Sequence, residues 1–530
     1  MQEPSEKKPK KLRHALKNAV LLSLLLATTT GSAFLLYDRV GAPTGFIRQN
    51  SELQFDSSVS DGEKTRIENE IVARKIPKLG NVTASIITTS TPQDHDIIEH
   101  VYVPVTSWNA SKQTVTKAEL GSNPPLLLKD TDDIIRTAIA HEINTDPTNL
   151  KALDSLDSIS TQQVVLIPIS RLDSSVKLLS LDDAYYLDSF NSGAIFRTVS
   201  FNGDGAGVYS TMTFSDIPTK DSTLSYTQTG VTALTRLMSR KLAQVDDPTY
   251  FSAKIGGFLR SADITHVSNE VSFMNNCEFS ATAFCSDPQF IETLKDSGVD
   301  VVELTGNHNN DRGRDPNTDS INQYRSLGWH TVGGGLNLSD AANYFTTDQK
   351  GSKVALLAYN YADSPNGGPI ATADDAGANP FDFDRIATDI KKAKSEGSFV
   401  IVDVQYFECY AYPDGFVEFP ECDKPIGDQE KDFKKLVDLG ADMVVGSSAH
   451  QPQYYEQYNS KSIYYGLGNL YFDQTQWPGT ERGIILTHYF SSGKLLQTKL
   501  SPTSYDESLQ TALMPNQQAE SFLARLQAAR

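Results

Sequence analysis

Four short apolar runs between residues 221 and 500 each end in a cluster of polar residues, and this repeat limits the folds open to the chain. The runs lie in VDVVELTGNHNND, FVIVDVQYFECY, ADMVVGSSAHQPQ and SIYYGLGNLYFDQ. The first three follow helix-like stretches that end at Gly298, Gly397 and Gly440. Glycine is the usual residue where a helix ends with a positive φ. The alternation predicts strand–helix–strand units and an α/β domain whose sheet is covered on both faces.

The polar clusters fall at the carboxyl ends of the predicted strands, where open α/β sheets place their ligand sites. The clusters comprise Asn307, His308, Asn309 and Asp311; Gln405 and Glu408; His450 and Gln453; and Asn469 and Asp473. We therefore expect them to converge on one site. The candidate acid/base groups are His308, His450, Glu270, Asp311 and Glu408. Histidine and carboxylate side chains also bind Mn, Zn or Fe, and no GxSxG or P-loop motif offers another chemistry.

The first 37 residues have the pattern of a membrane anchor. Residues 1–17 carry six basic and two acidic side chains, and residues 18–37 carry no charge. About 20 such residues cross the hydrocarbon core, and a basic flank favours a cytoplasmic N-terminus. We expect a single-pass protein of the cell membrane with the bulk of the chain extracytoplasmic. A signal peptide cut before Phe34, after Gly31 and Ala33, is the alternative; we favour the anchor because the apolar run continues past that cut.

Length and charge exclude several classes of protein. A chain of 530 residues is too long for one hydrophobic core, so two or more domains are expected. The formal net charge of −19 argues against a nucleic-acid partner whose binding rests on phosphate contacts. The predicted segments are a cytoplasmic basic tail (1–17), a transmembrane signal-anchor (18–37) and a linker or stalk (38–83). They are followed by a small α/β or α+β domain (84–220), the domain with the four apolar runs (221–500) and a C-terminal tail with a short helix (501–530).

Four cysteines fit an extracytoplasmic location. They are Cys277, Cys285, Cys409 and Cys422. Three pairings are open, of which the sequential one, 277 with 285 and 409 with 422, is the simplest. Disulfide bonds are the default in an oxidising compartment. Zinc ligation is the weaker interpretation, because neither pair has CxxC spacing.

Ordered motifs from residue 223 to residue 495 give the chain a family resemblance. They are GVTALTR, ADITHVSNEVSF, LTGNHNNDRG, VDVQYFECY, VVGSSAHQPQYYEQY and IYYGLGNLYFDQ. The segment resembles the CapA family of bacterial capsule-synthesis proteins, which is associated with poly-γ-glutamate capsules. The resemblance implies a calcineurin-like metallophosphatase fold, a layered sheet domain, and an anionic cell-surface polymer as partner. The preceding domain, 84–220, is similar to the substrate-binding-protein-like region that some such proteins carry.

Three positions depart from the family pattern. Val231 stands where the family has its first metal-binding Asp, and Gln405 and Ser447 stand where it has His. Valine cannot bind a metal, and Gln and Ser are weak neutral ligands for a borderline metal. A two-metal centre, which clamps both oxygens of a phosphoryl displacement, is therefore not expected. Whether the site binds one divalent metal ion, Mn, Zn or Fe, stays open.

The resemblance also implies roles for the residues that are retained. His308 and Asp311 match catalytic positions. The ligands of a single metal would be Glu270, Asn307 and His450. The predicted substrate-binding residues are Gln405, Glu408, Gln453 and Asn469, from their places at the strand ends, together with Arg236, which keeps the final position of the family's first motif.

Three hypotheses about function follow. The first is an envelope protein that helps to synthesise, attach or export an anionic capsule polymer such as poly-γ-glutamate. The second is a single-metal hydrolase of phosphoesters or amides. The third is a degenerate metallophosphatase-fold pseudoenzyme that binds a cell-envelope polymer. Val231, Gln405 and Ser447 favour the third hypothesis over the second, and whether the chain is an enzyme stays open.

Overall fold

The structure is a computed structural model that describes residues 52–77, 81–93, 96–212, 217–280, 283–361, 369–406, 428–475, 477 and 479–530. The chain divides into two compact units, Met1–Ser85 with Ser200–Met212, and Ile86–Val199 with Thr213–Arg530. The predicted anchor, residues 18–37, lies outside the described residues. Within the part of the chain that is described, no helix is both long and apolar enough to span a bilayer.

The first unit contains a strand and a helix where the sequence predicted a linker. Strand β1 (Glu52–Phe55) pairs in parallel with the first part of β2 (Asn81–Thr89), and helix α2 (Asp61–Ala73) lies between them in the chain. Ser60 and Glu63 form a capping box that starts α2, which satisfies backbone N–H groups left open by the first turn. The described part of the predicted linker therefore contains regular secondary structure.

The stretch from 86 to 199 of the second unit forms a mixed sheet. Its strand order is β10 (Ile195–Gly203), β3 (Ile97–Ser107), β7 (Val165–Pro168), β5 (Leu126–Leu128) and β6 (Ala152–Leu153), with β8 (Val176–Leu178) also on β3. Helix α4 (Asp133–Glu142) buries Ile139 and Ala140 in a cluster with Leu127 and Leu166 of the sheet. The short strands and the helix agree with the mixed α/β or α+β secondary structure predicted for residues 84–220.

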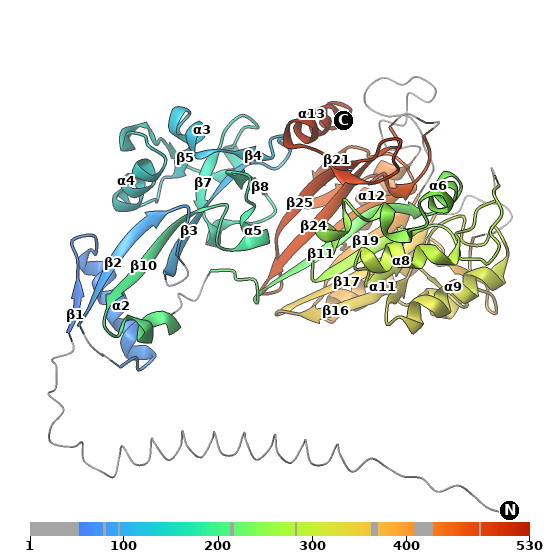
Figure 1. The fold of residues 1–530 in the computed structure, drawn as a ribbon, viewed down its shortest axis with the longest axis horizontal. Coiled ribbons are helices and arrows are strands. Elements are labelled where there is room, and N and C mark those ends of the chain that lie inside the picture. Colours follow the sequence, from blue (N-terminus) through green and yellow to red (C-terminus); the bar gives the residue numbers. More distant parts are fainter. Residues whose placement is uncertain are drawn as a thin grey trace, which may run out of the picture. The chain divides into compact units, whose positions relative to one another are not determined.

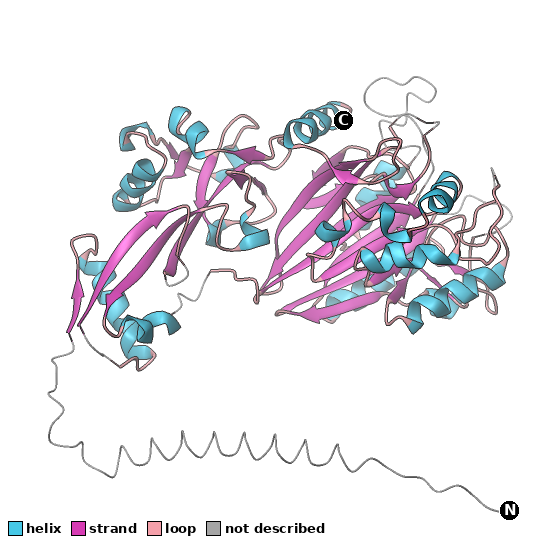
Figure 2. Ribbon diagram, viewed as in Figure 1, coloured by secondary structure: helices cyan, strands magenta, loops and turns pink. Residues whose placement is uncertain are grey.

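The rest of the second unit is built on two sheets (Figures 1 and 2). The first sheet has the order β14 (His330–Val332), β13 (Val301–Glu303), β12 (Ile264–Asn269), β11 (Thr223–Ala233), β24 (Arg482–Ser491), β25 (Lys494–Ser504) and β26 (Ala512–Leu513), with β23 (Asn469–Phe472) also on β11. The second sheet has the order β16 (Phe345–Gln349), β17 (Ser352–Asn360), β19 (Phe399–Gln405), β20 (Met443–Ser447), β22 (Lys461–Tyr464) and β21 (Tyr455–Tyr458). Strands β11 to β14, and separately β17, β19, β20 and β22, run parallel.

Helices cover the outer faces of these sheets, so the architecture has four layers. One core cluster joins Tyr226 and Ile264 of the first sheet to Leu356 and Ile401 of the second. Helices α6 (Leu237–Val245), α8 (Ile291–Asp296) and α9 (Arg314–Ser326) share a second cluster with the first sheet. Helices α11 (Phe383–Ser395) and α12 (Gln429–Asp438) pack on the second sheet. The predicted α/β architecture with layered sheets is confirmed.

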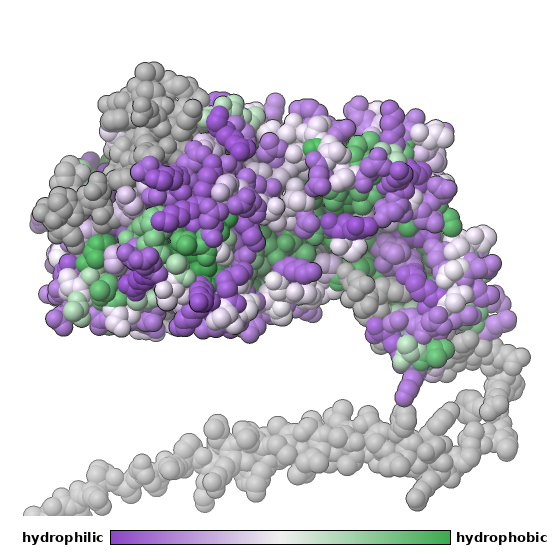
Figure 3. All heavy atoms as spheres, turned by 180° about the vertical axis from the view of Figure 1, so that it is seen from behind, coloured by the Kyte–Doolittle hydropathy of each residue, from purple (hydrophilic) through white to green (hydrophobic). Residues whose placement is uncertain are grey.

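Burial of apolar side chains in these layers leaves a mostly polar exterior. Figure 3 shows hydrophilic residues over most of the visible face, with hydrophobic atoms in separate patches between them. The chain ends in helix α13 (Asn516–Ala528), which packs against β25. One predicted disulfide, between Cys277 and Cys285, is present. Cys409 and Cys422 lie outside the described residues.

Gly230 allows β23 to approach β11 closely. The N–H of Val231 donates to the Gly468 carbonyl at 2.9 Å, and a Cβ on Gly230 would lie 2.0 Å from that oxygen. Because the obstacle is backbone, we expect Gly230→Ala to lower the free energy of unfolding by roughly 2–3 kcal/mol. The control is Gly257→Ala, where a Cβ meets nothing within 4 Å and the change should stay within about 0.5 kcal/mol. Urea unfolding measures both, and equal losses would contradict the prediction.

Candidate functional site

The carboxyl ends of three strands bring Glu270, Asn307 and Gln405 together. Glu270 follows β12, Asn307 follows β13, and Gln405 ends β19 of the other sheet. The Gln405 Nε2 donates to Glu270 Oε1 at 2.9 Å and to Asn307 Oδ1 at 3.3 Å. Glu270 is completely buried. One amide nitrogen therefore joins two oxygens from the first sheet to the second sheet.

His450 lies beside this group. It follows β20 with a φ of 52°, and its Nε2 is 3.9 Å from Glu270 Oε2. Its Nδ1 is 3.1 Å from Asn469 Oδ1 at the start of β23. The Asn469 amide also donates to Gln474 Oε1 at 3.2 Å. Polar residues from all four predicted clusters thus meet at one edge of the two sheets.

A second group forms around His308 and Asp311. The His308 Nδ1 lies 2.7 Å from Asp311 Oδ2, and the same oxygen accepts the Phe284 N–H at 2.8 Å. The Phe284 ring lies 4.4 Å from the imidazole, centroid to centroid. Phe284 is adjacent to Cys285, so the 277–285 disulfide constrains the loop that holds it. A carboxylate that fixes the imidazole is the arrangement of a general acid or base.

Arg236 connects the two groups through aromatic rings. Its guanidinium carbon lies 4.9 Å from the Phe284 centroid and 4.7 Å from the Phe472 centroid. The Nε pairs with Asp473 Oδ1 at 3.2 Å. Burial raises the pKa of Asp473 to about 6, and the positive charge of Arg236 opposes that rise. The Phe472 ring also packs against His450 at 5.2 Å, so Arg236 belongs to the same continuous site.

Gln453 and Glu408 complete the set of predicted site residues. Gln453 is buried on the loop between β20 and β21, where its backbone N–H donates to the Gly466 carbonyl at 3.1 Å. Glu408 lies outside the described residues. The catalytic, metal-binding and substrate-binding roles of the predicted residues stay predictions.

Comparison with known families identifies the segment that carries the site. Residues 225–474 match the sequence profile of the family described as bacterial capsule synthesis protein PGA_cap. These residues form a CapA-family domain. The resemblance drawn from the motifs is confirmed.

Two curated relatives share part of the CapA domain. Over 203 residues the chain is 30% identical to the capsule biosynthesis protein CapA of Bacillus anthracis, covering 38% of this chain and 46% of that one. Over 224 residues it is 25% identical to the PGA biosynthesis protein CapA of Bacillus subtilis (strain 168), covering 42% and 55%. The chain thus spans about half the length of these relatives. A solved structure of the sulfate thiohydrolase SoxB from Thermus thermophilus is 12% identical to the chain and has a TM-score of 0.29. It covers 50% of this chain and 42% of that one.

The donor set of the CapA domain does not fit a two-metal centre. Val231 is completely buried in an apolar cluster with Phe284 and Phe472. The Ser447 hydroxyl donates to Asp403 Oδ1 at 3.3 Å and to Gln405 Oε1 at 3.4 Å. Across the described ranges, no three His, Cys, Asp or Glu side chains are grouped as metal ligands. Two ligand positions of the family pattern are therefore part of a hydrogen-bond network, and the third is part of a hydrophobic wall.

A buried polar cluster between the two sheets was missed by the sequence analysis. Asp403 accepts a hydrogen bond from Gln228, and Glu303 Oε2 lies 3.1 Å from His266 Nε2. Burial raises the pKa of Asp403 well above its usual range and that of Glu303 to about 7, and it lowers the pKa of His266 to about 4. The signal was present in the sequence, because FVIVDVQ and VDVVELT each carry an acidic residue inside an apolar run. Ser447 links this cluster to the site.

The raised pKa of Asp403 predicts a dependence of stability on pH. Between the unfolded pKa of about 4 and the raised folded pKa, the native state holds a proton that the unfolded state has lost. The stability contributed by this carboxyl is therefore present at low pH and is lost as pH rises, by about 1.4 kcal/mol per pH unit in that window. Asp403→Asn removes the titration, so its free energy of unfolding should fall less steeply from pH 5 to pH 8.

Urea unfolding at pH 5, 6, 7 and 8 measures this difference. His266 acts in the opposite direction, since its lowered pKa makes stability rise with pH from about 4 to 6.5. Asp403 raises the pKa of His266 and lowers that of Glu303, which burial raises to about 7. The difference between the two proteins therefore reports Asp403 together with its effect on these two neighbours. The exposed Asp348→Asn is the matched control and should keep the parent slope. Identical slopes for Asp403→Asn and the parent would show that Asp403 is ionised in the native state.

Proposed function

We propose that this chain is an envelope protein that helps to synthesise, attach or export poly-γ-glutamate or a similar anionic surface polymer. The CapA domain supports this proposal, because the relatives it matches are named for capsule and PGA biosynthesis. In the same proposal, residues 18–37 anchor the chain in the cell membrane and the rest lies outside. The Cys277–Cys285 bond supports that location, since disulfides persist in oxidising compartments.

The proposed fold family is the calcineurin-like metallophosphatase family. Two facing sheets with helices on both outer faces support it, together with a polar site at the carboxyl ends of β12, β13, β19 and β20. In this proposal the chain keeps the strand-end site of that fold and uses it to bind polymer. The observation that carries this choice is the bond of the Gln405 amide to Glu270 and Asn307. A neutral donor occupies one Glu270 oxygen and the Asn307 oxygen, two of the atoms that would bind a metal ion.

The remaining groups suit an anionic ligand. Arg236 supplies a positive charge at the site, held by Asp473 and by two phenyl rings. The His308 imidazole, oriented by Asp311, supplies a second group that can bear positive charge. An arginine–carboxylate contact is charge-assisted and therefore stronger than a neutral hydrogen bond. A carboxylate on the polymer is the ligand group that this pair fits.

Genetic complementation tests the proposal in the bacterium that encodes the chain. Deletion of the gene should remove poly-γ-glutamate from the cell surface, and the wild-type chain should restore it. His308→Ala should restore less than about a tenth, because loss of the positioned group weakens the transition state or the complex by at least about 1.4 kcal/mol. The exposed His141→Ala is the control and should restore fully. Unchanged surface polymer after deletion would overturn the proposal.

A single-metal hydrolase of phosphoesters or amides is the second candidate. Glu270 Oε2 is buried, has no hydrogen-bond partner among the described residues, and lies 3.9 Å from His450 Nε2. Together with Asn307, these residues would hold one Mn, Zn or Fe ion. Such an ion supplies Lewis-acid polarisation of a phosphoryl or carbonyl oxygen. His308, fixed by Asp311, would hold the proton for the leaving group.

Metal content separates the two candidates. The full-length chain is purified from medium supplemented with Mn, Zn and Fe, beside His450→Ala and the exposed His141→Ala, and metals are measured by mass spectrometry. The polymer-binding proposal expects much less than one ion per chain in all three proteins. About one ion per chain that is lost only in His450→Ala would support the hydrolase and overturn the proposal that this site binds polymer.

A further inference from the structure

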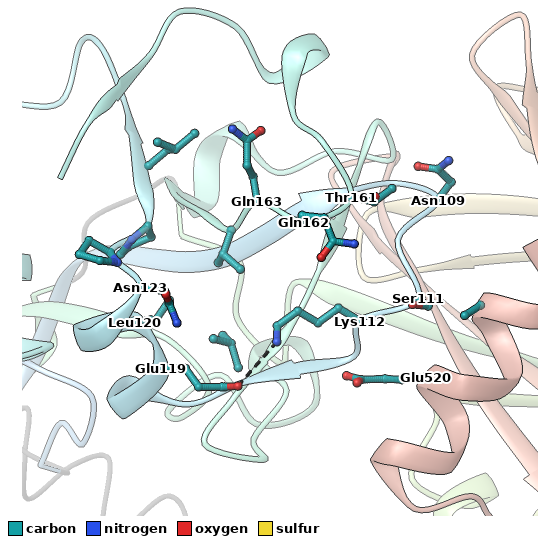
Figure 4. Close-up of a pocket in the computed structure, with 16 residues that line it drawn as sticks. Asn109, Ser111, Lys112, Glu119, Leu120, Asn123, Thr161, Gln162, Gln163 and Glu520 are labelled. Carbon is teal, nitrogen blue, oxygen red and sulfur yellow. Dashed lines mark ion pairs between the residues drawn. The ribbon is translucent and has the colours of Figure 1, made fainter. Parts of the chain in front are cut away.

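A polar cavity lies away from the CapA site, in the part of the second unit formed by residues 109–164 and helix α13. Its volume is about 630 Å³, within the range of small-molecule sites. Figure 4 shows side chains of Lys112, Gln162 and Glu520 around the same opening, each from a different segment of the chain. Helix α13 is distant in the sequence from residues 109–164, so the cavity forms only when these segments come together in the folded unit.

The charges at this cavity do not suit an anionic ligand. Lys112 is its basic residue, and its Nζ lies 3.8 Å from Glu119 Oε1. Glu520 adds a second carboxylate and accepts the Gln113 backbone N–H at 2.7 Å. Two acidic side chains face one basic side chain. A polymer of carboxylates would meet repulsion here, so the cavity selects against the polymer proposed for the CapA domain.

Neutral hydrogen-bonding groups form most of the polar lining. Asn109, Asn123, Thr161 and Gln162 are exposed at the cavity. Side-chain amides and hydroxyls both donate and accept hydrogen bonds, which is what a sugar hydroxyl or an acetamido group requires of its partner. Small apolar surfaces from Leu120, Pro124, Pro125 and Leu126 lie among them. This mixture matches a ligand that has polar edges and apolar C–H faces.

Asn109 also lines a second cavity, of about 670 Å³. It is lined by Trp108, whose ring lies edge-on to Tyr455 at 5.3 Å, and by the serines and aspartates of residues 157–175. An indole ring provides a flat apolar surface with a polar N–H. Residues 107–112, at the end of β3 and in the loop after it, therefore line two polar cavities. The second cavity is also lined by the aromatic ring of Trp108.

We propose that the two cavities form an extended binding site for a neutral oligosaccharide that bears hydroxyl and acetamido groups. Asn109 lies at the junction, Gln162 and Thr161 bind one part of the chain, and Trp108 contacts the ring face of another. The proposal concerns binding of the oligosaccharide alone. The proposal for this site does not depend on the function proposed for the CapA domain.

Calorimetry with the full-length chain tests the proposal. The probes are chitotetraose, which carries hydroxyl and acetamido groups, maltotetraose, which carries hydroxyls alone, and a short γ-glutamate oligomer. We expect binding of chitotetraose, weaker binding of maltotetraose and no binding of the γ-glutamate oligomer at these cavities. The variant Asn109→Ala with Gln162→Ala should weaken chitotetraose binding at least tenfold, since each lost hydrogen bond contributes about 1 kcal/mol.

A matched control keeps the result specific. Gln349→Ala removes an equally exposed amide from β16, far from both cavities in the sequence, and should bind chitotetraose like the parent. Both substituted positions are exposed, so the double variant should fold, which its unfolding midpoint verifies. Absence of binding to either sugar at millimolar concentration would overturn the proposal. So would parent-like affinity of the double variant, or γ-glutamate binding that the double variant abolishes.

Discussion

The Gln405 side chain joins the two sheets of the CapA domain, and the rest of the site is arranged around that bond. Its amide bonds to Glu270 and Asn307 of the first sheet, while its carbonyl oxygen accepts from Ser447 of the second. A buried carboxylate without a partner costs several kcal/mol, so a donor at this place is a condition for burying Glu270 at all. In a metalloenzyme a cation meets that condition; here an amide meets it on one carboxylate oxygen.

The departures from the family pattern are consistent with one another. Val231 extends an apolar wall that includes Phe284 and Phe472, and the same two rings hold the Arg236 guanidinium. An Asp in place of Val231 would put a charge into that wall. Ser447 bonds to Asp403 inside the sandwich as well as to Gln405, whereas an imidazole would need more volume there. Each of these two replacements is thus compatible with the side chains packed around it.

Much of this arrangement was predictable, because it depends on local rules. Gly298, Gly397 and Gly440 end helices with φ of 71°, 83° and 112°, as their place after helix-like stretches indicated. The polar clusters converge because parallel strands end at one edge of a sheet. The hydrogen bond from Gln228 of the first sheet to Asp403 of the second was not predictable, since the register between two facing sheets depends on how all their side chains pack. The two cavities and strand β1 likewise depend on contacts between segments that are distant in the sequence.

Net charge and local charge act at different ranges in this chain. The whole sequence carries −19, which by itself repels an anionic polymer. At physiological salt the Debye length is about 8 Å, so most of that repulsion is screened before contact. Close contacts then decide which ligand is held. In the two proposals, Arg236 and His308 contact a carboxylate at the CapA site, whereas Glu119 and Glu520 disfavour one at the cavity beside Lys112. The net charge of the chain is therefore compatible with both proposals, since each depends on the charges within contact distance of its own ligand.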